Sequence, residues 1–403
     1  MTEPTDAPSL ASSRRQRAVA TVRANLVGGR AFFADLLDRR SRANQWLTVG
    51  LGVIVGAACL WGLPAQIDAF PVGNDIELPL RAASHWVNGG QAYPASAMLV
   101  SRGPDLPFLY PPFLLPLLAP IAALPRDVVT VVWLAMCAAC AAWTCRRLAI
   151  PWLAVPFVLA WPPFAEGLIV GNVQIICFAA FAALVYERVD GKLRSRSFLP
   201  SRDVANGLLA AAIGVFKVSQ VLPGLYLARR RFRAAVLGAA VVLVGAAATL
   251  PLTGLSIYFD WLAQLQRAAD PAWEVGGVAL GRLFGIPELL LTAVGVAMAL
   301  AIRGRDGAAW LGIALILAAP NAHGYTFLFL LPGLLTIRRD LAIIIAALFL
   351  GVYHGYAWWM ATLLVAYFLV ASTRWTKLRA VDFDPDPKEA RGRDASPGEV
   401  SAT

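Results

Sequence analysis

Asp75, Lys217 and His323 are the residues whose type and position point most directly to chemistry. Lys217 and His323 interrupt long apolar runs, and Asp75 lies just after the first of these runs. An ionisable side chain at membrane depth costs at least about 2.5–3.5 kcal/mol, so such residues are rarely kept without a role. A carboxylate can take part in catalysis, and an ammonium or imidazole can bind a phosphate. Structural roles stay open, with Asp75 as a helix cap, Lys217 reaching toward an interface and His323 hydrogen bonded to a free carbonyl.

Two amides follow a glycine in the run Gly171-Asn172-Val173-Gln174. Asn172 and Gln174 can bridge helices by hydrogen bonds or contact a substrate hydroxyl, and the sequence favours neither role. Structural roles are favoured for the weaker candidates Glu166, Glu274, His85 and His354. All five cysteines lie within apolar blocks and are interpreted as small buried residues: Cys59, Cys137, Cys140, Cys145 and Cys177. We expect no metal site and no cofactor.

The composition places these residues in a membrane protein. Of 403 residues, 58% are hydrophobic and only 15% are charged, whereas soluble domains have about 25% charged residues. The apolar residues form continuous blocks, and about 20 such residues span a bilayer as a helix. Continuous rather than alternating blocks exclude a membrane β-barrel. The net charge of +10 comes from Lys and Arg at block ends, which is typical of cytoplasmic anchoring and not of nucleic-acid binding.

The fold class that follows is an all-α polytopic membrane protein, with about 10–12 transmembrane helices. Residues 1–45 are expected to form a polar cytoplasmic tail, 46–373 the transmembrane domain, and 374–403 a disordered cytoplasmic tail. The first apolar block is expected to be an uncleaved anchor. The loop 66–108 is poor in basic residues, so we place it on the outer face. Its helical pattern after Asp75 predicts an amphipathic helix in the outer interface.

Several segments break the regular alternation of membrane sides. The Arg-rich runs 188–202 and 229–233 both favour the inner face, yet only one block separates them. A helical hairpin dipping in around Lys217 would reconcile them. The block 308–337 is long enough for two short spans broken at Pro320-Asn321. Broken segments are tolerated where they line a cavity or pack within protein, so these breaks indicate an enclosed site.

The residues singled out above occur in an ordered set of short motifs. These are Asp75 with Ala82-Ala83, Gly89-Gly90 and Tyr93; Leu109-Tyr110-Pro111-Pro112; Pro163 with Gly171-Asn172-Val173-Gln174; Phe216-Lys217 with Leu222-Pro223 and Arg229 to Arg233; and His323-Gly324-Tyr325 with Leu331-Pro332. Over residues 46–373 this order resembles glycosyltransferase family 87, polyprenol-phosphate-sugar-dependent enzymes with the membrane-embedded GT-C fold. The chain departs from the family pattern at Leu78-Pro79 and at Val218-Ser219-Gln220, which bears on donor and acceptor identity more than on fold.

The resemblance implies a mannosyltransferase or arabinofuranosyltransferase of cell-envelope glycolipid synthesis, with mannose favoured. The donor would be a sugar on a polyprenyl phosphate, and the acceptor a lipid or lipid-linked glycan. Transfer would invert the sugar on the extracytoplasmic face of a bacterial plasma membrane. Asp75 and His323 would be the catalytic residues, with Asp75 as the general base, and Lys217 and His323 would bind the donor phosphate. Substrate contacts are expected from Glu77, Arg81, Tyr110, Asn172 and Gln174.

A secondary transporter or lipid flippase is the alternative function, and a structural membrane scaffold is a third. A transporter needs polar residues across the bilayer midplane and paired broken helices, whereas the polar candidates here gather near the outer loop. No Walker A motif supports an ATP-driven pump, and no H-E-x-x-H supports an intramembrane metalloprotease.

Overall fold

The computed structural model describes residues 42–94, 108–189, 192–195, 202–268, 277–302, 306–320, 322–350 and 355–379. The chain forms two compact units, residues 1–55 and 56–403. Helices make up the described elements, apart from one antiparallel hairpin of β1 (Tyr186–Val189) and β2 (Lys192–Ser195). The predicted all-α class is therefore confirmed. Most of both predicted tails, together with Glu274 and His354, lies outside the described residues.

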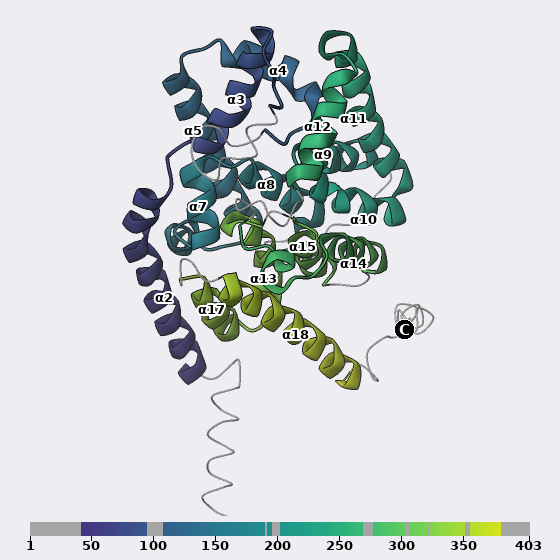
Figure 1. Cartoon of the computed structure of the whole chain (residues 1–403). Coiled ribbons are helices and arrows are strands. Elements are labelled where there is room, and N and C mark those ends of the chain that lie inside the picture. The colour runs from purple at the N-terminus through teal and green to yellow at the C-terminus, as the bar shows by residue number, and fades with distance from the viewer. Residues whose placement is uncertain are drawn as a thin grey trace, which may run out of the picture. The chain divides into compact units, whose positions relative to one another are not determined.

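Prolines begin many of the helices, because the first helical turn needs no backbone N–H from them. The α-helices are α2 (Arg42–Ala69), α3 (Asn74–Val87), α4 (Leu115–Ala122), α5 (Arg126–Arg147), α6 (Val155–Leu159), α7 (Pro162–Val170), α8 (Gln174–Val185), α9 (Asp203–Phe216), α10 (Leu222–Arg230), α11 (Phe232–Thr253), α12 (Ser256–Ala268), α13 (Leu280–Phe284), α14 (Glu288–Ala301), α15 (Gly307–Leu317), α16 (Leu331–Thr336), α17 (Arg339–Ala347) and α18 (Gly355–Arg379). The 3-10 helices are η2 (Pro112–Leu114), η3 (Trp152–Ala154), η5 (Val218–Val221), η6 (Gly324–Leu330) and η7 (Leu348–Leu350). Within the larger unit, α9 packs on α11 and α14 on α15 (Figure 1).

Three described segments are long and apolar enough to cross a bilayer: Gln45–Val87, Arg126–Arg147 and Phe232–Thr253. The pair Trp152–Leu159 and Pro162–Val170 qualifies only as one span bent by 70°. Other apolar helices have 10–17 residues, which is about 15–26 Å of helix, less than the roughly 30 Å of a bilayer core. The polytopic membrane class is confirmed, whereas ten to twelve crossings stay a prediction.

The segment around Lys217 folds as a hairpin. α9 ends at Phe216, and α10 begins at Leu222 after the short η5. At the open end, the Arg231 guanidinium donates two hydrogen bonds to the Asp203 carboxylate, at 2.9 and 2.8 Å. The start of α9 therefore lies beside the end of α10, as a hairpin requires; the membrane face on which the two basic runs lie stays a prediction.

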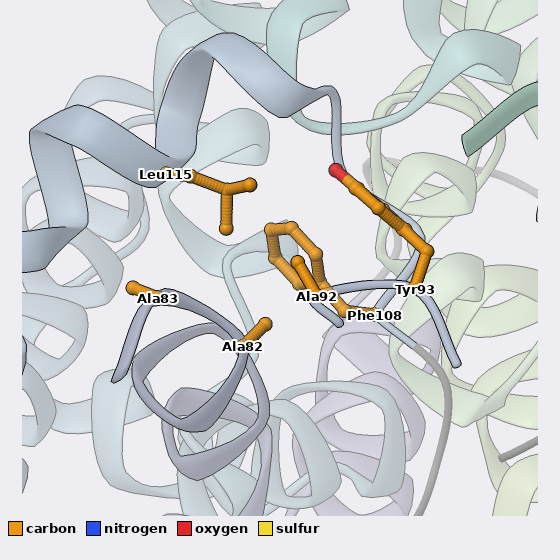
Figure 2. Packing of buried hydrophobic residues seen from close by; sticks show 6 residues of the cluster. All are labelled: Ala82, Ala83, Ala92, Tyr93, Phe108 and Leu115. Carbon is orange, nitrogen blue, oxygen red and sulfur yellow. The ribbon is translucent and has the colours of Figure 1, made fainter. Parts of the chain in front are cut away.

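The predicted amphipathic helix after Asp75 is α3, which begins at Asn74. Leu80 and Ala83 are fully buried, and Trp86 packs against the apolar cluster that contains Ala83. Val87 is exposed, so the apolar face is narrower than predicted. Figure 2 shows the cluster that holds α3 against α4, made of Ala82, Ala83, Ala92, Tyr93, Phe108 and Leu115. This cluster therefore fixes the second half of α3 against α4.

Gly312 lies where α15 and η6 touch backbone to backbone. A Cβ at this position would overlap the carbonyl oxygen of Phe329, whose side chain is fully buried. Because packed interiors give way only by shifting neighbours, the contact demands glycine here.

We expect Gly312→Ala to destabilise the protein by about 1–3 kcal/mol, since the added methyl group forces α15 and η6 apart. The matched control is Gly245→Ala in α11, where no atom lies within 4 Å of the new methyl group. This control should be neutral or slightly stabilising, because alanine is the better helix former. Melting curves of the purified protein in detergent measure both. Equal melting temperatures for the two variants would contradict the close contact.

Candidate active site

The predicted site residues lie at helix ends and breaks. Asp75 is in the first turn of α3, Asn172 between α7 and α8, and Lys217 between α9 and η5. Tyr110 lies just before η2, and His323 just before η6. Helix ends leave backbone polar groups free and let side chains from different segments approach each other. The sequence predicted that helix breaks would line an enclosed site, and the candidate site residues do lie at such breaks.

Asp75 is held by Asn172. The Asn172 Nδ2 donates a short hydrogen bond to Asp75 Oδ2, while its Oδ1 accepts from the Gln174 backbone N–H at 2.8 Å. The second bond fixes which end of the amide faces the carboxylate. The N-cap of α3 is Gly73, and α3 has no side-chain cap. The alternative that Asp75 only caps its helix is therefore wrong.

Backbone contacts fix α3 against the end of α7. The Gly73 N–H donates to the Ile169 carbonyl at 2.9 Å, and Gly73 adopts φ +72°, which favours glycine. The Trp133 indole N–H donates to the Gly171 carbonyl at 2.6 Å. The Asn172 N–H closes the end of α7 by donating to the Gly167 carbonyl at 2.8 Å. Asp75 and Asn172 are thus positioned by rigid neighbours on both sides.

Lys217 faces the same cluster. Its Nζ lies 4.9 Å from the centre of the Tyr325 ring, within the range of a cation–π contact. The ammonium also interacts electrostatically with the carboxylates of Asp75 and Glu166. One cation is therefore shared by two acidic side chains, which gives Lys217 partners within the protein; its position relative to the membrane interface stays a prediction.

His323 stacks against Tyr325, with ring centroids 5.3 Å apart. Burial, together with the nearby charges of Lys217 and Arg282, lowers the pKa of His323 to about 4. The imidazole is therefore neutral at pH 7. In this form it can donate or accept hydrogen bonds, but it supplies no positive charge to a phosphate.

We expect acid to destabilise the protein through His323. Its folded-state pKa lies below the unfolded value of about 6.5, so the unfolded chain binds a proton that the folded chain excludes. Stability should fall as the pH drops from about 6.5 toward 4. His323→Gln, which cannot titrate, should lose less stability across this range than the parent chain. Melting temperatures at pH 7.5, 6, 5 and 4.5 measure the difference; parallel curves would contradict a neutral buried imidazole.

Glu166 is the residue that sequence reasoning undervalued. Its side chain is 8% exposed and accepts a hydrogen bond from the Gly324 N–H. A Cβ at Gly324 would overlap the Glu166 carboxylate, so a larger residue there would displace this carboxylate from its position. The carboxylate interacts with Asp75 and Lys217, and it therefore belongs to the cluster. The sequence feature that could have identified Glu166 is an acidic residue within an apolar block. For Tyr325, which contacts Lys217 and His323, the sequence offered only the motif that contains it.

Three residues predicted to contact the substrate either pair with other side chains of the protein or lie farther along α3 from Asp75. Glu77 pairs with Arg126 of α5 at 3.3 Å, and both side chains are about 40% exposed. Gln174 is 1% exposed, and its Oε1 accepts a hydrogen bond from Gln220 of η5, so it bridges helices. Arg81 lies six residues along α3 from Asp75, about 9 Å along the axis. Substrate binding by these residues stays a prediction.

Tyr110 lies beside the cluster. Its ring centre is 6.2 Å from that of Phe216, which precedes Lys217, and its carbonyl accepts a hydrogen bond from the Tyr93 hydroxyl at 2.7 Å. The Trp261 indole N–H donates to the neighbouring Leu109 carbonyl at 3.0 Å. These contacts tie the start of η2 to α12 and to the loop after α3.

Comparison with known proteins gives one family. The family model of glycosyltransferase family 87 matches residues 108–337. This range is more than half of the chain and includes Glu166, Asn172, Lys217 and His323, while Asp75 precedes it. No curated protein and no solved structure matches the chain. With its apolar helices, the chain is a membrane glycosyltransferase that belongs to glycosyltransferase family 87.

Proposed function

We propose that this glycosyltransferase moves a sugar from a polyprenyl phosphate to a lipid or lipid-linked glycan acceptor, with inversion at the anomeric carbon. Mannose is the favoured sugar, and the reaction takes place on the extracytoplasmic face of a bacterial plasma membrane. The observation that carries the proposal is the cluster in which Asp75, Asn172 and Lys217 meet at helix ends.

Asp75 is the general base. It removes the proton from an acceptor hydroxyl as that oxygen attacks the anomeric carbon. The hydrogen bond from Asn172 holds the carboxylate in one orientation. The first turn of α3 adds the positive end of a helix dipole, which favours the ionised carboxylate. Because the base occupies one side of the sugar and the phosphate leaves from the other, the configuration inverts.

Lys217 and His323 hold the phosphate that leaves. As the bond between the anomeric carbon and the phosphate oxygen breaks, the oxygen keeps the electron pair and gains negative charge. Lys217, between α9 and η5, supplies a cation. His323 supplies a hydrogen bond from a neutral imidazole. Preorganised groups aimed at developing charge are typically the largest source of rate enhancement.

A reconstituted transfer assay tests the proposal. The full chain in lipid nanodiscs is given polyprenyl-phosphate mannose with a radiolabelled sugar and a membrane-lipid acceptor. We expect label in the acceptor fraction, with slower or no transfer from polyprenyl-phosphate arabinofuranose. The same label on GDP-mannose is the control for donor class. Transfer from GDP-mannose alone would overturn the lipid-phosphate donor, and movement of lipid without covalent transfer would favour the flippase alternative.

A further inference from the structure

One aromatic side chain, that of Tyr325, contacts both residues to which the proposed function gives the donor phosphate. The His323 ring is stacked against the Tyr325 ring, with the two centroids 5.3 Å apart and the planes inclined by 29°. The Lys217 Nζ lies over the same ring, 4.9 Å from its centre. A histidine and a lysine that are far apart in the chain are therefore brought to a single ring.

The Tyr325 ring is held in place by its surroundings. Tyr325 is 8% exposed and belongs to η6, in which every residue is buried. A Cβ at Gly167 of α7 would lie 3.1 Å from the Tyr325 Cβ, so α7 packs closely against the base of the ring. The Thr326 N–H donates to the His323 carbonyl at 2.9 Å, and the His323 N–H donates to the Thr326 hydroxyl at 3.2 Å. Packing and hydrogen bonds thus keep the ring and the His323 backbone together.

The Lys217 side chain, in contrast, is a flexible four-carbon chain with two acidic neighbours, Asp75 and Glu166. An ammonium that closed an ion pair with either carboxylate would offer less charge and fewer N–H groups to a phosphate. Among the described residues, the ion pairs do not include Lys217. The negative face of an aromatic ring attracts a cation without supplying a charged oxygen to its N–H groups. The Tyr325 ring can therefore hold the ammonium and leave its donors available.

Holding Lys217 before the substrate arrives has a consequence for binding. A lysine side chain that becomes ordered only on binding loses rotamer freedom, and this loss opposes binding. Groups that are already oriented toward the position where charge develops do not need to reorganise during the reaction. A ring that orders both the ammonium of Lys217 and the imidazole of His323 should therefore strengthen the binding of one phosphate by both.

We propose that Tyr325 is the positioning residue of the phosphate site, holding the Lys217 ammonium over its ring and the His323 imidazole in a stack so that both meet one phosphate. The inference rests on the proposed function, because it assumes a polyprenyl-phosphate donor bound by these two residues. It assigns the effect to the aromatic ring of Tyr325 and not to the hydroxyl group. The ring itself needs no contact with the donor.

The test measures binding of a short-chain polyprenyl monophosphate to the full chain in nanodiscs, beside kinetics with the sugar-linked donor. Tyr325→Leu should weaken monophosphate binding by about 5- to 30-fold, the range for a desolvated cation–π contact. The KM for the donor should rise by a similar factor, whereas the KM for the acceptor should stay the same. Tyr325→Phe keeps the ring and should bind as the parent does.

A ring-fluorinated phenylalanine at position 325 provides a variant that keeps the shape of the side chain. Fluorine withdraws negative charge from the ring face, so this protein should pack like Tyr325→Phe but bind the monophosphate more weakly. It keeps the test decisive if Tyr325→Leu does not fold. Tyr186→Leu is the matched control for loss of a buried ring, because Tyr186 is also 8% exposed. Tyr186 follows α8, about 18 Å along the helix from Gln174, so its replacement should leave monophosphate binding unchanged.

A double-mutant cycle separates positioning of Lys217 from general support of the fold. In the Lys217→Gln chain the ring has no ammonium to hold, so Tyr325→Leu should there have an effect at least about threefold smaller than in the parent. Equal effects in the two backgrounds would overturn the inference. So would equal binding by the Phe and fluorinated proteins, or a loss in Tyr325→Phe as large as in Tyr325→Leu.

The inference and the proposed function can fail separately. If Tyr325→Leu binds the monophosphate as the parent does while Lys217→Gln loses binding, the inference is wrong and the proposed function stands. If the parent chain shows neither sugar transfer nor monophosphate binding, the proposed function is wrong, and the inference that rests on it is wrong as well.

Discussion

Asp75→Asn is expected to lower sugar transfer by about 100- to 10,000-fold, the usual contribution of a general base. This corresponds to about 2.7–5.4 kcal/mol of transition-state stabilisation. Asparagine has nearly the same shape as aspartate and can still meet the Asn172 amide, but it cannot accept the acceptor proton. Binding of the polyprenyl phosphate should persist or tighten, because Lys217 loses one of its two acidic neighbours. Initial rates and phosphate-binding curves measure the two effects separately.

The matched control is Asp127→Asn, an exposed carboxylate in the first turn of α5. It should transfer sugar and melt as the parent chain does. Glu166→Gln tests the other carboxylate of the cluster. If Asp75→Asn retained transfer within about threefold of the parent while Glu166→Gln abolished it, the base would be Glu166 and the proposed role of Asp75 would fall.

Lys217→Gln should be the second most damaging change. We expect kcat/KM for the polyprenyl-phosphate donor to fall by about 100- to 1,000-fold, as when one donor to a developing negative charge is removed. Both constants should change, because in the proposed mechanism the ammonium binds the donor phosphate and binds the leaving phosphate more strongly. The KM for the acceptor should change little, since the proposed partner of Lys217 is the phosphate and not the acceptor. Varying each substrate in turn at saturating levels of the other measures this.

Folding needs its own check in this variant, because the Asp75 and Glu166 carboxylates lose the cation between them. Lys217→Arg keeps the charge and should melt near the parent while restoring part of the donor affinity. Arg233 is an exposed residue of the basic run at the start of α11. Arg233→Gln is therefore the matched control for the loss of one positive charge. A well-folded Lys217→Gln protein with an unchanged KM for the donor would contradict phosphate binding by Lys217.

The cluster explains why the chain keeps charged groups within apolar surroundings. Asp75 and Glu166 share Lys217, while Gly324 and Asn172 supply hydrogen bonds to the two carboxylates. A buried charge without such partners would cost several kcal/mol. The partners come from helix ends and breaks, where backbone and side-chain polar groups are free to turn inward. The irregular segments of the fold and the polar residues of the site are thus two parts of one arrangement.

The sequence by itself determined the membrane class, the helix after Asp75 and the breaks at Lys217 and Pro320. These features depend on local composition: long apolar blocks favour helices in lipid, and polar residues or prolines interrupt them. The ordered motifs were also enough to indicate family 87, which the match over residues 108–337 confirms. Helical periodicity could also have separated Glu77 from Asp75, because residues two apart on a helix face different directions.

Only the tertiary structure decided which distant residues meet. Glu166 joins Asp75 because Gly324, far along the chain, leaves room for its carboxylate. Gln174 bridges to Gln220, whereas its neighbour Asn172 holds Asp75. The segment that contains Val278 lies beside His323 because the Val278 N–H donates to the Ala322 carbonyl. Local sequence sets where a helix starts and stops, but contacts across such separations depend on how the helices pack, which no short pattern encodes.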